Sequence, residues 1–77
     1  MSLIPSRIVK SIFLKIPNCR LCKSVSNEYK IIFEFNYDII AIPKKGITVD
    51  HLSHILEYQF EMSWWMIDYI YGENGIR

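Results

Sequence analysis

The segment Tyr29-Lys-Ile-Ile-Phe-Glu-Phe-Asn-Tyr-Asp-Ile-Ile-Ala-Ile-Pro43 carries the clearest structural signal in this 77-residue sequence. Its two halves, 29–35 and 38–43, are rich in β-branched and aromatic residues, a composition that favours strands. Asn36-Tyr37 lies between them, and asparagine is a natural turn residue. We therefore predict a β-hairpin, which the sequence Lys44-Lys45-Gly46 closes.

Upstream of the hairpin, residues 5–16 are predicted to form a helix. Their apolar side chains recur at helical spacing, at Ile4, Ile8, Val9, Ile12, Phe13 and Ile16. A proline is tolerated in a first helical turn, as at position 5, and Pro17 would end the helix. The many β-branched residues leave a strand as the alternative. Residues 17–28 are predicted to be a polar loop.

Downstream of the hairpin, we predict one long C-terminal helix. Thr48 or Asp50 can serve as its N-cap, because each side-chain oxygen can accept from first-turn N–H groups. One apolar stripe runs along it, formed by Leu52, Ile55, Leu56, Phe60, Trp64 and Ile67. Gly72 is a candidate stop. The predicted fold class is thus α+β, a single domain over 1–77 in α-β-β-α order with the hairpin packed on the long C-terminal helix.

Composition excludes several classes of protein. Hydrophobic residues make up 51% of the chain and the net charge is +1, which excludes intrinsic disorder. The length fits one domain. No run of about 18 uncharged apolar residues is present, so we expect no membrane partner. Two cysteines are too few for a secreted disulfide framework, and the start lacks a signal-peptide pattern, so the predicted location is cytoplasmic.

The C-terminal segment is the strongest candidate for a binding surface. Beyond residue 60 the predicted helix is apolar on nearly every side, and the hairpin and first helix can cover only part of it. Trp, Tyr and Met are enriched in interface cores. We predict a contact with a protein partner or with a second copy, in a homo-oligomer, through Trp64, Trp65, Met66, Tyr69 and Ile70. The alternative is that this helix is the central core element of a monomer.

A second constellation pairs Cys19-Arg20-Leu21-Cys22 with His51-Leu52-Ser53-His54. Cysteines spaced in this way can present both sulfurs from a tight turn, and histidines at i and i+3 share a helix face. The order of loop pair, hairpin and helix-start pair is similar to the treble-clef type of zinc site. The resemblance implies a structural zinc held by Cys19, Cys22, His51 and His54. The alternative is that these are free thiols and solvated imidazoles.

Charge is unevenly distributed along the chain. Residues 1–45 hold eight of the nine basic side chains, whereas residues 46–77 hold five of the eight acidic ones. A basic half can meet phosphates, and Arg7, Lys10, Arg20 and Lys23 are the candidate contacts with nucleic acid. The commoner explanation is a solvated charged face.

Sequence motifs typical of enzymes are absent, since the chain has no Gly-rich phosphate loop, no G-x-S-x-G and no H-E-x-x-H. The sequence therefore favours a small non-catalytic regulatory or adaptor protein that acts by macromolecular binding without a cofactor, its aromatic C-terminal helix being the contact or self-association surface. The alternative is a zinc-stabilised nucleic-acid-binding module.

Overall fold

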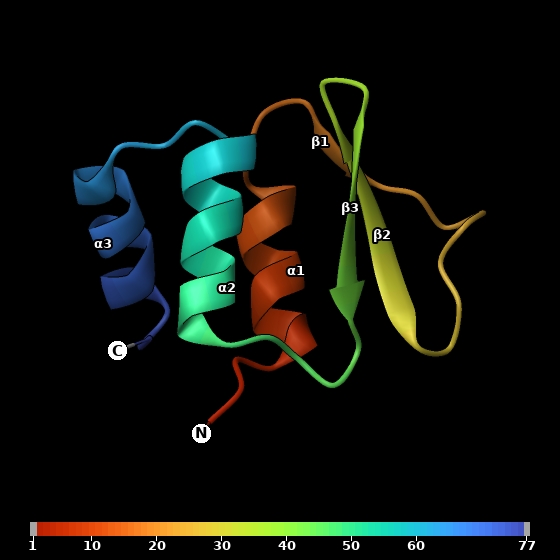
Figure 1. Ribbon diagram of the computed structural model, residues 1–77, viewed down its shortest axis with the longest axis horizontal. Helices are drawn as coiled ribbons and strands as arrows, with labels where there is room; N and C mark the ends of the chain where they lie inside the picture. Colours follow the sequence, from red (N-terminus) through yellow and green to blue (C-terminus); the bar gives the residue numbers. More distant parts are fainter. Residues whose placement is uncertain (1, 77) are drawn as a thin grey trace.

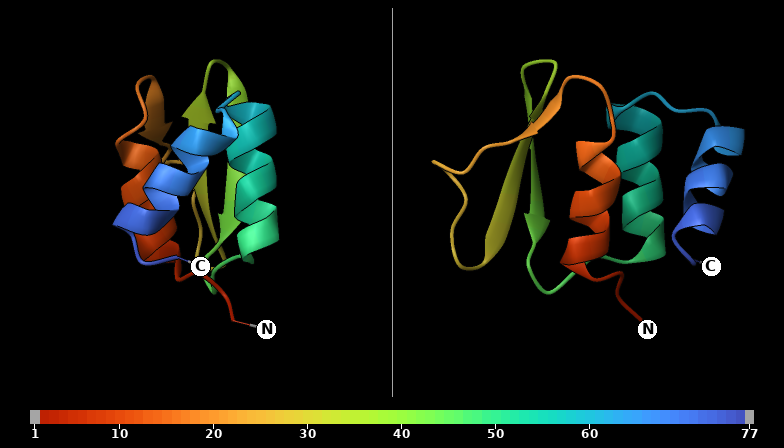
Figure 2. Two further views of the ribbon diagram at one scale, coloured as in Figure 1. Left: turned by 90° about the vertical axis from the view of Figure 1, so that its left-hand side faces the viewer. Right: turned by 180° about the vertical axis from the view of Figure 1, so that it is seen from behind.

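The computed structural model describes residues 2–76 and has an α+β fold, with helices on one face of a three-stranded antiparallel sheet (Figure 1). In chain order its elements are α1 (Ser6–Leu14), β1 (Cys19–Leu21), β2 (Lys30–Phe35), β3 (Asp38–Pro43), α2 (Val49–His54), a π-helical turn η1 (Ile55–Gln59) and α3 (Trp64–Glu73). Three layers follow one another: the sheet, then α1 beside α2, then α3 (Figures 1 and 2).

The predicted hairpin is confirmed, and its turn explains why it forms. β2 pairs with β3 in antiparallel register, with Ile31 opposite Ile42 and Phe33 opposite Ile40. Asn36 and Tyr37 make the two-residue turn with φ of 48° and 71°. Two positive φ values define the type I′ geometry, whose twist matches that of paired strands.

The predicted polar loop over 17–28 is wrong at its start, because Cys19–Leu21 forms the edge strand β1. This strand pairs with β2, with Cys19 opposite Phe35 and Leu21 opposite Phe33. Three residues are too few to show alternation in sequence, and the strand exists because β2 offers a free edge of backbone groups. The sheet order is therefore β1-β2-β3.

The first helix is confirmed in place of the alternative strand, and it supplies the centre of the core. α1 buries Val9, Ile12 and Phe13. The ring of Phe13 meets Phe33 of β2 edge-on, with centroids 5.0 Å apart, and meets Phe60 at 5.1 Å. The core face of the sheet thus packs on the layer formed by α1, α2 and η1.

The predicted single C-terminal helix is wrong, because the chain breaks between η1 and α3. Glu61 has φ of +55°, and the N–H of Met62 donates back to the Leu56 carbonyl. An unbroken helix over residues 49–73 would be about 37 Å long, whereas the longest dimension of the molecule is 33 Å. The break lets both halves lie along the core, and α3 forms the outer layer, away from the hairpin (Figure 2).

The ends of these helices follow capping rules. Thr48 is the N-cap of α2, since its Oγ1 accepts from the N–H of His51 at 3.1 Å. The stop of α3 is Gly75 and not Gly72, which lies within the helix. Gly75 has φ of +68°, and the N–H of Ile76 donates to the Tyr71 carbonyl at 2.8 Å. This bond and the left-handed residue form a Schellman end.

The N-terminal segment is tied to the connection between β3 and α2. Ile4 and Ile47 exchange two backbone hydrogen bonds, at 2.7 and 3.1 Å, and both side chains are buried. Gly46 precedes this bridge with φ of +105°, and a Cβ there would collide with the Ile4 carbonyl oxygen. Only glycine satisfies both the conformation and the close approach.

We predict that Gly46→Ala destabilises the fold by about 2 kcal/mol or more, because the substitution adds backbone strain and breaks the Ile4–Ile47 bridge. The measurement is the free energy of unfolding in urea. Gly72→Ala is the matched control, since no atom lies within 4 Å of its added Cβ and the position is helical. That variant is expected to be unchanged or slightly more stable. Equal effects of the two substitutions would contradict this account of Gly46.

Candidate aromatic docking groove

α3 presents most of its aromatic side chains to solvent. Ile67 and Tyr71 are its buried residues, whereas Trp65 and Tyr69 are 73% and 65% exposed. The alternative of a central core helix is therefore wrong, because α3 covers α1 and α2 with a single stripe. Within residues 2–76, nothing covers its outer side.

A polar contact holds α3 against α2. The hydroxyl groups of Ser53 and Tyr71 lie 2.6 Å apart, and the Tyr71 hydroxyl also donates to the Val49 carbonyl at 3.3 Å. Burial raises the pKa of Tyr71 above its ordinary value, so the phenol stays neutral and keeps its proton for donation. This contact fixes the rotation of α3 and thereby decides which side chains face outward.

An apolar groove of about 380 Å³ lies between α3 and the C-terminal end of α1. Four of the five predicted contact residues line it, and Trp64 does not. The residues around this α1–α3 groove are Ile12, Lys15, Ile16, Pro17, Met62, Trp65, Met66, Tyr69, Ile70, Glu73 and Asn74. The α1 wall was not predicted, since sequence spacing gives no sign that α1 and α3 lie side by side.

The charges on this groove are few and of opposite sign. Lys15 belongs to the α1 wall and Glu73 to the α3 wall, and both side chains are exposed. Glu73 also accepts from the Tyr69 hydroxyl at 3.3 Å. As far as residues 2–76 are concerned, the groove is thus an apolar channel with one cation and one anion on facing walls.

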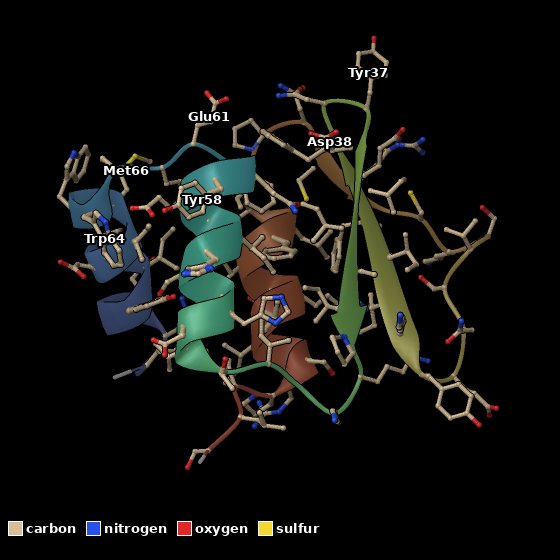
Figure 3. All side chains as sticks on the ribbon, in the orientation of Figure 1. Tyr37, Asp38, Tyr58, Glu61, Trp64 and Met66 are labelled. Carbon is tan, nitrogen blue, oxygen red and sulfur yellow. The ribbon has the colours of Figure 1, made fainter. Side chains whose placement is uncertain are left out.

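Trp64 lies outside the groove, and Tyr58 is a second exposed aromatic residue outside it. Trp64 is 55% exposed, and Tyr58 of η1 is 70% exposed. Both side chains lie at the same end of the molecule, at α3 and the end of η1, and far from Tyr37 at the hairpin turn (Figure 3). The exposed aromatic residues therefore continue around α3 beyond the groove.

The four predicted zinc ligands are not brought together. Within residues 2–76, no group of three or more His, Cys, Asp or Glu side chains is placed to hold a metal ion. Cys19 packs against the core, while the N–H of Cys22 continues the ladder to Ile32. His51 and His54 lie exposed on α2, so the treble-clef arrangement does not form.

Cys19 is a free, half-buried thiol. Burial, and next the neighbouring Cys22, raise the pKa of Cys19 from 9.0 to about 11. Only the thiolate is nucleophilic, so this cysteine is protonated and unreactive near neutral pH.

We expect the single thiol of a Cys22→Ser variant to react with iodoacetamide at pH 8 roughly tenfold or more slowly in the folded protein than in the unfolded one. The measurement is the alkylation rate by mass spectrometry, with and without guanidinium. Because the folded-state pKa is the higher one, the stability that the neutral thiol contributes is present below about pH 9 and is lost as the pH rises through 11. Equal alkylation rates would contradict this description of Cys19.

The four predicted nucleic-acid contacts are also separated by the fold. Arg20 donates to Glu34 across β1 and β2 at 2.7 Å, and this hydrogen bond raises the pKa of Arg20. Arg7 is exposed on α1. Lys10 and Lys23 do line one hollow, together with Lys44, which was not among the predicted contacts.

Comparison with known proteins gives no relative: no family model, no curated protein and no solved structure matches this chain. Among the helices of residues 2–76, none has the length and hydrophobicity needed to cross a membrane.

Proposed function

We propose that this protein is a small non-catalytic regulatory or adaptor protein that acts by binding another protein surface through the α1–α3 groove. The observation that carries the proposal is the exposure of Trp65 and Tyr69 beside an apolar groove. Monomeric proteins rarely leave contiguous apolar surface of this kind open to water. Tryptophan and tyrosine supply most binding energy in protein interfaces.

A second copy of the same chain is the occupant that the groove fits best. Trp65 and Tyr69 form a ridge directly beside the groove, so two copies related by a twofold axis can each insert a ridge into the other's groove. In such an arrangement Lys15 of one copy meets Glu73 of the other, and the pair occurs twice. Opposite charges on the two walls of one groove are what such a twofold interface requires.

The surface available suits a dimer of ordinary size. A stable interface covers about 800 Å² on each partner, which is roughly 15% of the 5333 Å² accessible surface. Trp65 and Tyr69 together present on the order of 300 Å². The remaining groove walls, from Ile16 to Met62, supply apolar area around them.

Truncating the two ridge residues, Trp65 and Tyr69, should strongly weaken self-association without unfolding the chain. We expect the wild type to dimerise, and Trp65→Ala/Tyr69→Ala to weaken the dimer about a thousandfold or more, since buried aromatic anchors are worth about 2 kcal/mol or more each. Sedimentation equilibrium over micromolar to millimolar concentrations measures this. Tyr37→Ala is the control, because Tyr37 is 96% exposed at the hairpin turn, away from the groove. A wild type that stays monomeric throughout would overturn self-association.

The opposed charges allow a second, independent test. Lys15→Glu or Glu73→Lys alone would place like charges together across the twofold axis and is expected to weaken the dimer about tenfold. The double variant Lys15→Glu/Glu73→Lys restores opposite charges and should recover most of the affinity. Lys45→Glu, outside the groove, makes the same charge change and should leave the affinity unchanged. Absence of recovery in the double variant would contradict the twofold pairing of Lys15 with Glu73.

A further inference from the structure

A second hollow, remote from the α1–α3 groove, gathers three lysines from three segments of the chain. Lys10 comes from α1, Lys23 from the turn after β1 and Lys44 from the end of β3. The hollow measures about 270 Å³, and Leu21, Ser26 and Ile31 complete its lining. No carboxylate from residues 2–76 lines it.

The three ammonium groups have no acidic partner in the part of the chain that the structure describes. The ion pair in that part of the chain joins the side chain of Arg20 on β1 to that of Glu34 on β2. Like charges around one hollow repel each other. The apolar side chains of Leu21 and Ile31 also line the hollow, and apolar surroundings weaken the screening of charges by water. A bound anion would relieve this repulsion.

The backbone that presents the lysines is held by hydrogen bonds. The N–H of Lys44 donates to the Tyr29 carbonyl at 2.9 Å. The turn that carries Lys23 is closed by Ser26, whose hydroxyl donates to the Cys22 carbonyl and accepts from the N–H of Ile32, both at 3.0 Å. Lys10 projects from a helix. The backbone positions from which the three lysines extend to the hollow are therefore set by the fold before any ligand arrives.

We propose that this three-lysine hollow binds the phosphate group of a phosphorylated ligand. Lysine ammonium groups are compact point charges that suit a multiply charged, tetrahedral anion, whereas a planar carboxylate is better matched by the fork of an arginine. Lys30 and Lys45 lie in the adjoining hollow, which Lys44 also lines, and Glu28 is the acidic side chain there. Basic charge thus continues from the site to the end of the sheet where β2 begins and β3 ends. The phosphate can belong to a small molecule or to a nucleic-acid backbone.

The test compares thermal melting in sodium pyrophosphate with melting in sodium chloride of equal ionic strength. Wild type is expected to melt about 4 °C or more higher in pyrophosphate. Lys23→Gln/Lys44→Gln should lose this difference while melting normally in chloride, because neither side chain is buried. Lys15→Gln, which removes the same kind of charge from the groove, should keep it. A difference of equal size in wild type and the double variant would overturn the site, since general salt effects act on both alike.

A second arm separates the two sources of phosphate. A fluorescent single-stranded oligonucleotide is titrated with each protein, and its dissociation constant is followed against salt. Binding that weakens about fivefold or more for Lys23→Gln/Lys44→Gln but not for Lys15→Gln assigns the site to a nucleic-acid backbone. Stabilisation by pyrophosphate without such binding assigns it to small phosphorylated ligands. Failure of both arms refutes the site and leaves the dimer experiments, which use other residues, unaffected.

Discussion

Four phenylalanine rings hold the sheet and the helical layer together. Phe13 of α1 lies against Phe33 of β2 and against Phe60, and Phe60 also contacts Phe35 with centroids 4.6 Å apart. Phe60 follows directly after η1, and the next residue, Glu61, has a positive φ at which the chain turns. This reversal places α3 in a third layer.

The third layer decides what the surface offers. A chain of 77 residues builds one sheet and one helical layer around this aromatic cluster, and few apolar groups remain to cover α3. Ile67 and Tyr71 turn inward, and the Ser53–Tyr71 contact keeps that rotation. The large side chains on the other sides of the helix are consequently presented to solvent and to the α1–α3 groove. Apolar content that would be core in a larger domain is surface in this one.

The same layering separates the charges. α1 and the segments that follow β1 and β3 carry the lysines of the three-lysine hollow, whereas residues 49–73, from α2 to the end of α3, carry Asp50, Glu57, Glu61, Asp68 and Glu73 and no lysine or arginine. The two proposed binding surfaces therefore differ in chemistry as well as in place: one is apolar and aromatic with a single charge of each sign, the other is cationic. Each can be altered without touching the other.

The sequence by itself determined the local elements. β-Branched and aromatic composition with turn chemistry were sufficient for the hairpin with its Asn36-Tyr37 turn, and helical spacing for α1, because these features depend on neighbours in the chain. It also placed the surplus of aromatic residues after residue 60. Tertiary structure alone decided that β1 forms on the free edge of β2, that the C-terminal helix breaks at Glu61, and that α1 supplies the other wall of the groove. It also separated Cys19 and Cys22 from the histidines and united Lys44 with Lys10 and Lys23. Such outcomes depend on contacts between distant segments and on the size of the core, which spacing along a single chain does not encode.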